Sequence, residues 1–168
     1  MITAIIALIL SNFTVAMIVL GILLAALSIY RSDSPRNREL VTDRLLAYLL
    51  LCAAGFTGVH GFIMHTFFSD FTAHFIGWQS NPFQFEVGMA NLAVGILGIL
   101  AFRAGRGFRS ATVIATSIFL LGAWVGHIVQ MVTQHNFAPG NAGSIFYTDL
   151  IIPVLLLTLL LLRYRSQA

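Results

Sequence analysis

Apolar residues are gathered into five long runs, separated by short segments that hold most of the polar side chains. A membrane-spanning helix needs about 20 mainly apolar residues, because each residue advances the helix by only about 1.5 Å. All five runs are close to this length or longer. They predict transmembrane helices over residues 2–29, 40–68, 83–102, 111–133 and 145–162.

The composition places the whole chain, residues 1–168, in a single all-α membrane bundle. Hydrophobic residues make up 58% of the chain and charged residues 9%, whereas about 25% of a typical soluble domain is charged. The lipid bilayer is therefore the expected partner, and a net charge of +3 does not indicate nucleic acid. A single cysteine, Cys52, excludes a disulfide within the chain.

Basic residues predict the orientation of the bundle. All nine are arginines: four flank the connection between the first two runs, three lie between the third and fourth, and two follow the fifth. With five spans these places share one side of the membrane, and the other side receives no arginine. The positive-inside rule then predicts an outside N-terminus, an inside C-terminus and a multi-pass location in the cytoplasmic (inner) membrane.

The other ionisable residues gather in the outer half of the predicted bundle. All five histidines lie there, as do the acids outside the first inner loop. The residues His60, Glu86, His127 and Asp149 stand on four different predicted helices at overlapping depth. An ionisable group in hydrocarbon costs several kcal/mol unless it faces the bundle interior and finds a partner. We therefore expect these four residues to converge on one internal site as metal ligands.

Other residues are expected around this site. The residues predicted to contact the ligands, without binding the metal themselves, are Asn91, Gln130, Tyr147, Met64 and Met131. The two methionines each follow a histidine by one helical turn and so share its helix face. The remaining histidines are predicted at the rim: His65, His74 and His135. His65 points about 140° away from His60 on a helix, and the other two lie in loops.

Two cofactor-binding functions fit this pattern. Two imidazoles and two carboxylates from four helices suit a transition metal such as iron, copper or zinc. His60 and His127, on different helices at similar depth, also suit the two axial positions of a b-type haem. Either cofactor favours a role in redox chemistry or electron transport, and the pattern assigns no catalytic residue.

Two functions without a cofactor stay open. The same acids and histidines would bind and release protons or cations in a small transporter. The inner half of the bundle, however, offers few polar residues to continue a path across the membrane. A small polytopic chain also fits a non-catalytic accessory subunit of a larger membrane complex, or a homo-oligomer.

Glycines recur close to the expected site. Gly55 and Gly58 precede His60 by five and two residues, and Gly122 and Gly126 form a GxxxG pair before His127. Small residues let membrane helices approach each other closely. Both groups of glycines therefore predict close helix packing next to the histidines.

The two outer connections also carry structural signals. Phe71, Phe75 and Trp78 predict a short amphipathic segment that lies in the membrane interface. Between the fourth and fifth runs, Pro139 and Asn141 belong to a set of turn-forming residues in APGNAG. This second connection is expected to be an ordered turn.

Three blocks between Gly55 and Pro153 carry a resemblance to known sequences. They read GFTGVHGFIMHTFF, GWQSNPFQFEVGMANLAVGILG and NFAPGNAGSIFYTDLIIP, and their most distinctive runs are GW, PFQFEVGMAN and APGNAG. In these blocks the chain resembles an uncharacterised family of bacterial and archaeal multi-pass membrane proteins. The resemblance implies a membrane protein, and its first two blocks overlap Gly55–Asn91, the stretch that contains His60, His65, His74 and Glu86. It implies no activity.

Overall fold

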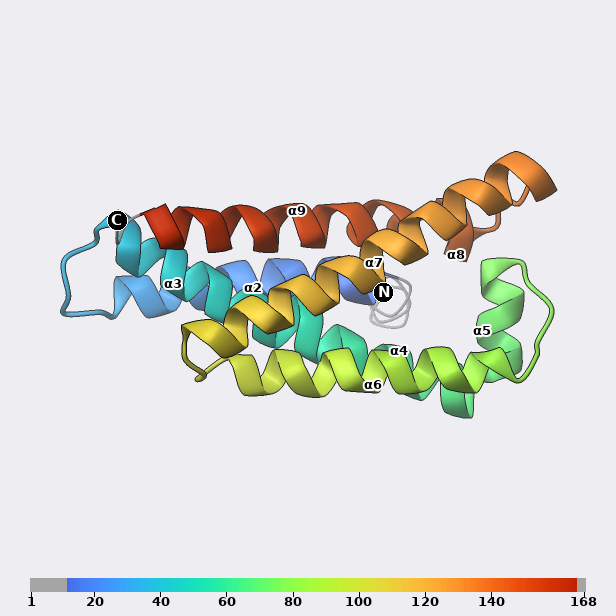
Figure 1. Ribbon diagram of the computed structural model, residues 1–168, viewed down its shortest axis with the longest axis horizontal. Helices are drawn as coiled ribbons and strands as arrows, with labels where there is room; N and C mark the ends of the chain where they lie inside the picture. The colour runs from blue at the N-terminus through green and yellow to red at the C-terminus, as the bar shows by residue number, and fades with distance from the viewer. Residues whose placement is uncertain (1–11, 166–168) are drawn as a thin grey trace, which may run out of the picture.

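The computed structural model describes residues 12–165, and all regular structure in that range is helical (Figure 1). In chain order the elements are α2 (Phe13–Tyr30), α3 (Arg38–Leu49), η1 (Leu50–Phe56), α4 (Thr57–Phe67), α5 (Ser69–Ile76), α6 (Phe83–Ala101), α7 (Arg106–Gln134), α8 (Pro139–Ala142) and α9 (Ser144–Arg165). The element η1 is a π-helix, and it joins α3 and α4 into one continuous rod.

Within the described range, five helices are long and apolar enough to cross a membrane. They are Phe13–Tyr30, Arg38–Phe67, Phe83–Ala101, Arg106–Gln134 and Pro139–Arg163. These helices confirm the five predicted spans, although the part of the first prediction before residue 12 lies outside the described residues. The fourth span begins at residue 106 rather than 111, because the polar segment after the α6–α7 turn is already helical.

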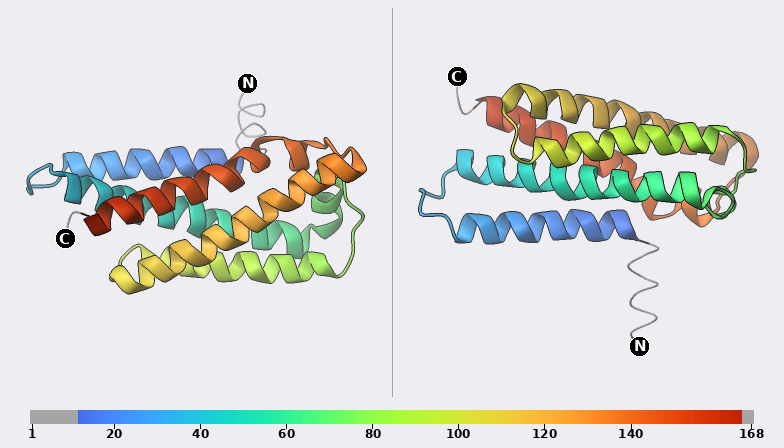
Figure 2. Two further views of the ribbon diagram at one scale, coloured as in Figure 1. Left: turned by 45° about the horizontal axis from the view of Figure 1, so that its top comes forward. Right: turned by 90° about the horizontal axis from the view of Figure 1, so that it is seen from below.

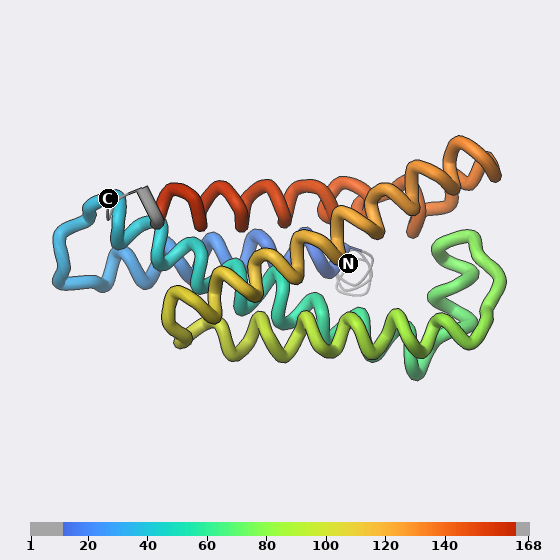
Figure 3. The backbone as a smooth tube through the Cα atoms, viewed as in Figure 1, coloured from blue at the N-terminus to red at the C-terminus, as the bar shows by residue number. Residues whose placement is uncertain are grey.

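The helices run roughly along one long axis, so the bundle has two distinct ends (Figures 1 and 3). We call the end with the α2–α3 loop, the α6–α7 turn and the last turn of α9 the Arg-rich end. The opposite end, with α5, α8 and the last turns of α7, is the His-rich end. Between them, α4 and η1 pack on α6, α7 packs on α9, and α3 packs on both α2 and α9 (Figure 2).

The apolar core lies in the half of the bundle nearer the Arg-rich end. It combines residues of α3, η1 and α9 with one residue each from α6 and α7, namely Leu46, Leu49, Leu50, Ala53, Ala101, Val113, Ile152, Leu156, Leu159 and Leu160. In the other half, the buried residues include His127, Asn141 and Asp149. Among the described residues, the buried histidine and the buried carboxylate therefore both lie in the half nearer the His-rich end.

Glycines bring the second and third spans into backbone contact, as predicted. A Cβ atom added at Gly58 would lie 2.6 Å from the Gly95 nitrogen, and one at Gly98 would lie 2.5 Å from the Gly55 nitrogen. Gly55 belongs to the π-helix η1, whose i→i+5 hydrogen bonds make a wider turn than those of an α-helix. Side chains beyond η1 are therefore rotated from the positions that a continuous α-helix would give them.

The GxxxG pair on α7 does not make the close contact that its sequence predicts. A Cβ atom added at Gly122 or Gly126 would meet no atom of the described chain within 4 Å. The prediction of tight helix packing before His127 is therefore wrong for this pair. Here α7 turns its glycines outward and presents other residues to α9.

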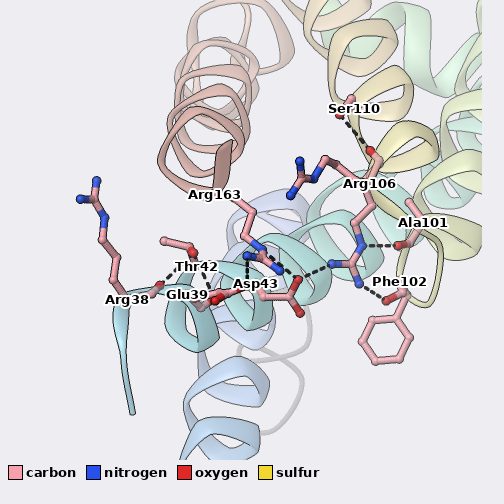
Figure 4. Close-up of polar contacts among 10 residues, drawn as sticks. Arg38, Glu39, Thr42, Asp43, Ala101, Phe102, Arg106, Ser110 and Arg163 are labelled. Carbon is pink, nitrogen blue, oxygen red and sulfur yellow. Dashed lines mark hydrogen bonds and ion pairs between the residues drawn. The ribbon is translucent and has the colours of Figure 1, made fainter. Parts of the chain in front are cut away.

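Ion pairs and hydrogen bonds tie the Arg-rich end together (Figure 4). The Arg109 guanidinium donates to Asp43 Oδ1 at 2.9 Å, and to the carbonyl oxygens of Ala101 at 2.9 Å and Phe102 at 2.7 Å. Those carbonyls belong to the C-terminal end of α6, where helical acceptors lack an intrahelical donor. Arg163 of α9 pairs with Glu39 and Asp43 of α3. One cluster thus joins α3, α6, α7 and α9.

Candidate functional site

The candidate site is built around His127, which lies on α7 near the His-rich end. Its side chain is only 8% exposed, and its Nδ1 atom lies 2.7 Å from Oδ1 of Asn141 on α8. Asn141 is completely buried. The contact joins the fourth span to α8, the short helix at the start of the fifth span.

Further hydrogen bonds fix the orientation of the Asn141 amide. Its Nδ2 atom donates to the carbonyl oxygens of Asn136 at 2.8 Å and His127 at 3.3 Å. Since both hydrogens of the amide nitrogen are used in this way, the amide oxygen must face the imidazole. The Nδ1 atom of His127 therefore carries a hydrogen and donates it to Asn141.

This arrangement determines what the other nitrogen of His127 can do. The Nε2 atom faces Asp149 Oδ2 of α9 at 3.6 Å, and the Asp149 side chain is 10% exposed. In a neutral imidazole with hydrogen on Nδ1, Nε2 presents a lone pair. A lone pair facing a carboxylate is repulsive, so the pair is favourable only when a proton lies on Nε2 or on Asp149.

Helix α9 has an interior proline close to this pair. Pro153 lies one helical turn after Asp149 and is buried within the bundle. Proline lacks the N–H group that an α-helix would use to bond the carbonyl four residues earlier. Asp149 thus lies at a position where the helical hydrogen-bond ladder is interrupted.

The turn that carries Asn141 is held by contacts with α5. Asn136 Nδ2 donates to the Ile76 carbonyl oxygen at 2.9 Å. Gly77 ends α5 with φ +80°, and a Cβ there would lie 2.5 Å from Asn136 Oδ1, so only glycine fits. The predicted amphipathic segment is thus a helix, α5, and the predicted ordered turn after α7 contains α8.

A polar depression of about 650 Å³ lies on the surface of the His-rich end. Its lining includes Trp78 and Asn81 from the α5–α6 loop, with Gln130, Gln134 and Asn136 from the end of α7. The backbone oxygen of Asn136 is also an acceptor for Asn141. A single residue therefore separates this depression from the buried cluster.

The structure brings together two of the four predicted metal ligands. His127 and Asp149 form a pair, whereas His60 stacks on Phe13 of α2 with ring centroids 4.1 Å apart. Glu86 is exposed in the first turn of α6, where a carboxylate is stabilised by the helix dipole. In the part of the chain that the structure describes, no three His, Cys, Asp or Glu side chains are grouped to hold a metal ion.

The residues predicted to support the ligands lie on α4, α6, α7 and α9. Gln130 lines the polar depression. Asn91 instead bonds the Val87 carbonyl within α6 and fills the space beside Gly61, and Tyr147 is 61% exposed. The sulfur-containing residues are partly buried: Met64 and Met131.

The three predicted rim histidines have different surroundings. His65 is partly buried, and its Nδ1 atom lies 2.6 Å from Oε1 of the buried Gln84 on α6. His74 is exposed on α5. His135 is exposed in the left-handed backbone conformation that ends α7, with φ +50°. None of these contacts involves the His127–Asp149 pair.

Asn141 is the important residue that the sequence pattern does not identify as part of a site. It lies in the APGNAG run, where its residue type and its neighbours indicate a turn. Turn asparagines are mostly exposed, whereas this one is fully buried and makes three hydrogen bonds. The one feature of the sequence that marks Asn141 is its position in APGNAG, one of the distinctive runs that carry the family resemblance.

Comparisons with known proteins agree with the resemblance seen in the sequence. Neither the curated proteins nor the solved structures contain a match to the chain. The profile of a family of unknown function, DUF6790, matches residues 11–168. The match spans nearly the whole bundle, including α7, α8 and α9 with the His127 cluster. The chain therefore belongs to the DUF6790 family, a family of unknown function.

Proposed function

We propose that this protein is a multi-pass membrane protein that binds and releases a proton at the His127–Asp149 pair, as part of proton-coupled transport. The observation that carries the proposal is the distance of 3.6 Å between His127 Nε2 and Asp149 Oδ2, two side chains that are both buried. Because Asn141 fixes the hydrogen on Nδ1, one proton between Nε2 and Oδ2 keeps the pair favourable. Removing it leaves a lone pair against a carboxylate.

Access from the His-rich end supports this role. The polar depression touches Asn136, which is hydrogen-bonded to Asn141 and through it to His127. These hydrogen bonds end at Nδ1 of His127, and the Nε2 atom that faces Asp149 lies on the other side of the same ring. A backbone carbonyl and a neutral amide do not relay protons, so the pair would exchange its proton with water that enters the bundle from the depression.

Buried hydroxyl groups on α7 support access of water to the pair from the Arg-rich end as well. Toward that end, the face of α7 that points into the bundle carries Thr112, Thr116 and Ser117. The hydroxyl oxygens of Thr116 and Ser117 are buried and have no hydrogen-bond partner among the described residues. Buried hydroxyls without partners favour bound water. The inner half thus offers more polar groups than the sequence pattern indicates.

The test of this proposal is the substitution Asp149→Asn. Asparagine keeps the shape of the side chain and can donate to Nε2, but it cannot gain or lose a proton. In purified protein we expect the carboxyl C=O band of protonated Asp149 to vanish from infrared difference spectra recorded between acidic and neutral pH. In proteoliposomes, proton flux driven by a pH gradient should fall roughly 100-fold, as expected when a proton-transfer group is lost.

Asp70→Asn is the matched control, because Asp70 is exposed on α5 at the same end of the bundle. This variant should keep both the proton flux and the buried carboxyl band. Unchanged flux and an unchanged band in Asp149→Asn would refute the proposal. A native protein that carries no proton flux would refute transport, even if the band shows that the pair binds a proton.

A metal site is a second candidate that uses the same two atoms. Histidines that bind metals usually donate their other N–H to a neighbouring acceptor, as His127 does to Asn141. His127 Nε2 and an Asp149 oxygen would supply two ligands, and water or a partner molecule would supply the rest. Elemental analysis of the purified protein tests this: iron, copper or zinc at one atom per chain, lost in His127→Gln, would favour the metal.

We also propose that the Arg-rich end faces the cytoplasm, following the positive-inside rule. The exposed residues Ser34, in the α2–α3 loop, and Ser80, in the α5–α6 loop, mark the two ends. In spheroplasts with an intact membrane, a membrane-impermeant maleimide should label Ser80→Cys directly and Ser34→Cys only after lysis. The buried Cys52 should give little background. The reverse labelling pattern would invert the topology.

A further inference from the structure

A second pocket, of about 340 Å³, lies between α2 and α3 near the Arg-rich end. Two guanidinium groups line it, from Arg31 at the end of α2 and Arg44 on α3. Ser28, Ser32 and Tyr48 add hydroxyl groups to the same lining. The pocket thus presents several hydrogen-bond donors and two positive charges.

No carboxylate of the described residues forms an ion pair with Arg31 or Arg44. The acids of α3, Glu39 and Asp43, are engaged by arginines of α7 and α9 in the cluster described above. Asp33 in the α2–α3 loop is exposed and forms no ion pair with another described residue. An anion from outside the chain would therefore meet uncompensated charge here.

Arg44 gives a second observation that points to a ligand. Its Nε atom is buried and has no hydrogen-bond partner among the described residues. A buried guanidinium N–H without an acceptor costs free energy, so such a group is normally paired. An acceptor that enters the pocket would satisfy it.

We propose that this pocket binds the phosphate group of an anionic phospholipid. Arginine is the preferred residue for phosphate, because its planar fork donates two parallel hydrogen bonds to two oxygens. Hydroxyl groups of Ser28 and Ser32 complete the donors around such a group.

The apolar part of the pocket favours a lipid over a free phosphate ion. Leu24 and Leu27 line the side that continues along α2 into the membrane-spanning segment. Tyr48 combines an aromatic ring with a hydroxyl group, which suits the boundary between acyl chains and headgroups. A lipid places its phosphate at the arginines and its acyl chains along the leucines, whereas a free ion uses only the first contact.

The test compares the native protein with the double variant Arg31→Gln/Arg44→Gln in detergent. Native mass spectrometry with added phosphatidylglycerol should show one retained lipid on the native protein. The double variant should bind it at least about tenfold more weakly, since hydrogen bonds to charged groups contribute on that order. Arg103→Gln is the matched control, because Arg103 is exposed at the same end and does not line the pocket.

Three outcomes would overturn the proposal. The first is equal retention of phosphatidylglycerol by the native protein and the double variant, and the second is an equal loss in Arg103→Gln. The third is displacement of the lipid by millimolar inorganic phosphate, which would make the site one for a free ion. Ser28→Leu, which fills the pocket without removing charge, should also lose the lipid and covers the case in which the double variant does not fold.

Discussion

Gly58→Ala is expected to lower the stability of the bundle by at least about 2 kcal/mol, as overpacking of a tight core does. The added Cβ would lie 2.6 Å from the Gly95 nitrogen and 2.7 Å from the Asn91 carbonyl oxygen. Both are backbone atoms of α6, so a side-chain rotation cannot relieve the overlap. The helices α4 and α6 must separate. SDS titration of the purified protein, followed by circular dichroism, measures the loss.

Gly122→Ala is the matched control for this prediction. It makes the same change in another span, at a position where a Cβ meets nothing within 4 Å of the described chain. Alanine has a higher helix propensity than glycine by about 1 kcal/mol. We therefore expect Gly122→Ala to retain or raise stability. A similar loss in both variants would show that glycine content, and not the α4–α6 contact, determines stability.

Asn141→Ala is expected to destabilise the His-rich end by about 3 kcal/mol, because three buried hydrogen bonds are lost without replacement. The variant leaves His127 Nδ1 and the carbonyl oxygen of Asn136 without their side-chain partner. It also removes the group that fixes which imidazole nitrogen carries the hydrogen. SDS titration should show the lower stability, and infrared difference spectra should show a shifted carboxyl band for Asp149.

Gln134→Ala is the control for the Asn141 variant. Gln134 is exposed at the same end of the bundle, and its bond to Thr133 is a long 3.5 Å. This change should leave stability within about 0.5 kcal/mol of the native value, as is usual for surface substitutions. If Asn141→Ala were equally mild and left the carboxyl band in place, Asn141 would not orient His127.

The five spans were predictable from the sequence because the bilayer imposes a simple condition. A segment in hydrocarbon must satisfy its own backbone groups, and only a helix does so within one segment. Apolar length therefore determines where the spans lie, and the short connections determine their ends. The second span was predicted as one helix over 40–68, and the structure has it from Arg38 to Phe67.

The candidate site was only partly predictable, because depth in the membrane does not determine which way a side chain points. His60 and Glu86 match His127 in depth, yet one stacks on Phe13 and the other is exposed. The π-helix η1 changes the direction in which the side chains after it point around the helix axis, and His60 is one of them. Nothing in the apolar pattern indicates a π-helix here. Asn141 reaches His127 from a different element, and no periodicity connects the two residues.

Pro153 has a consequence for the chemistry available at Asp149. The residue carries two kinds of oxygen: its carboxylate, which faces His127, and its backbone carbonyl, whose usual helical donor is missing because residue 153 is proline. The carbonyl does not titrate, so it stays an acceptor whether or not the carboxylate holds a proton. A hydronium ion, a water molecule or a small cation at Asp149 would thus meet two kinds of acceptor. The backbone carbonyl oxygen accepts a hydrogen bond at any pH, whereas the charge of the carboxylate changes when it takes up a proton.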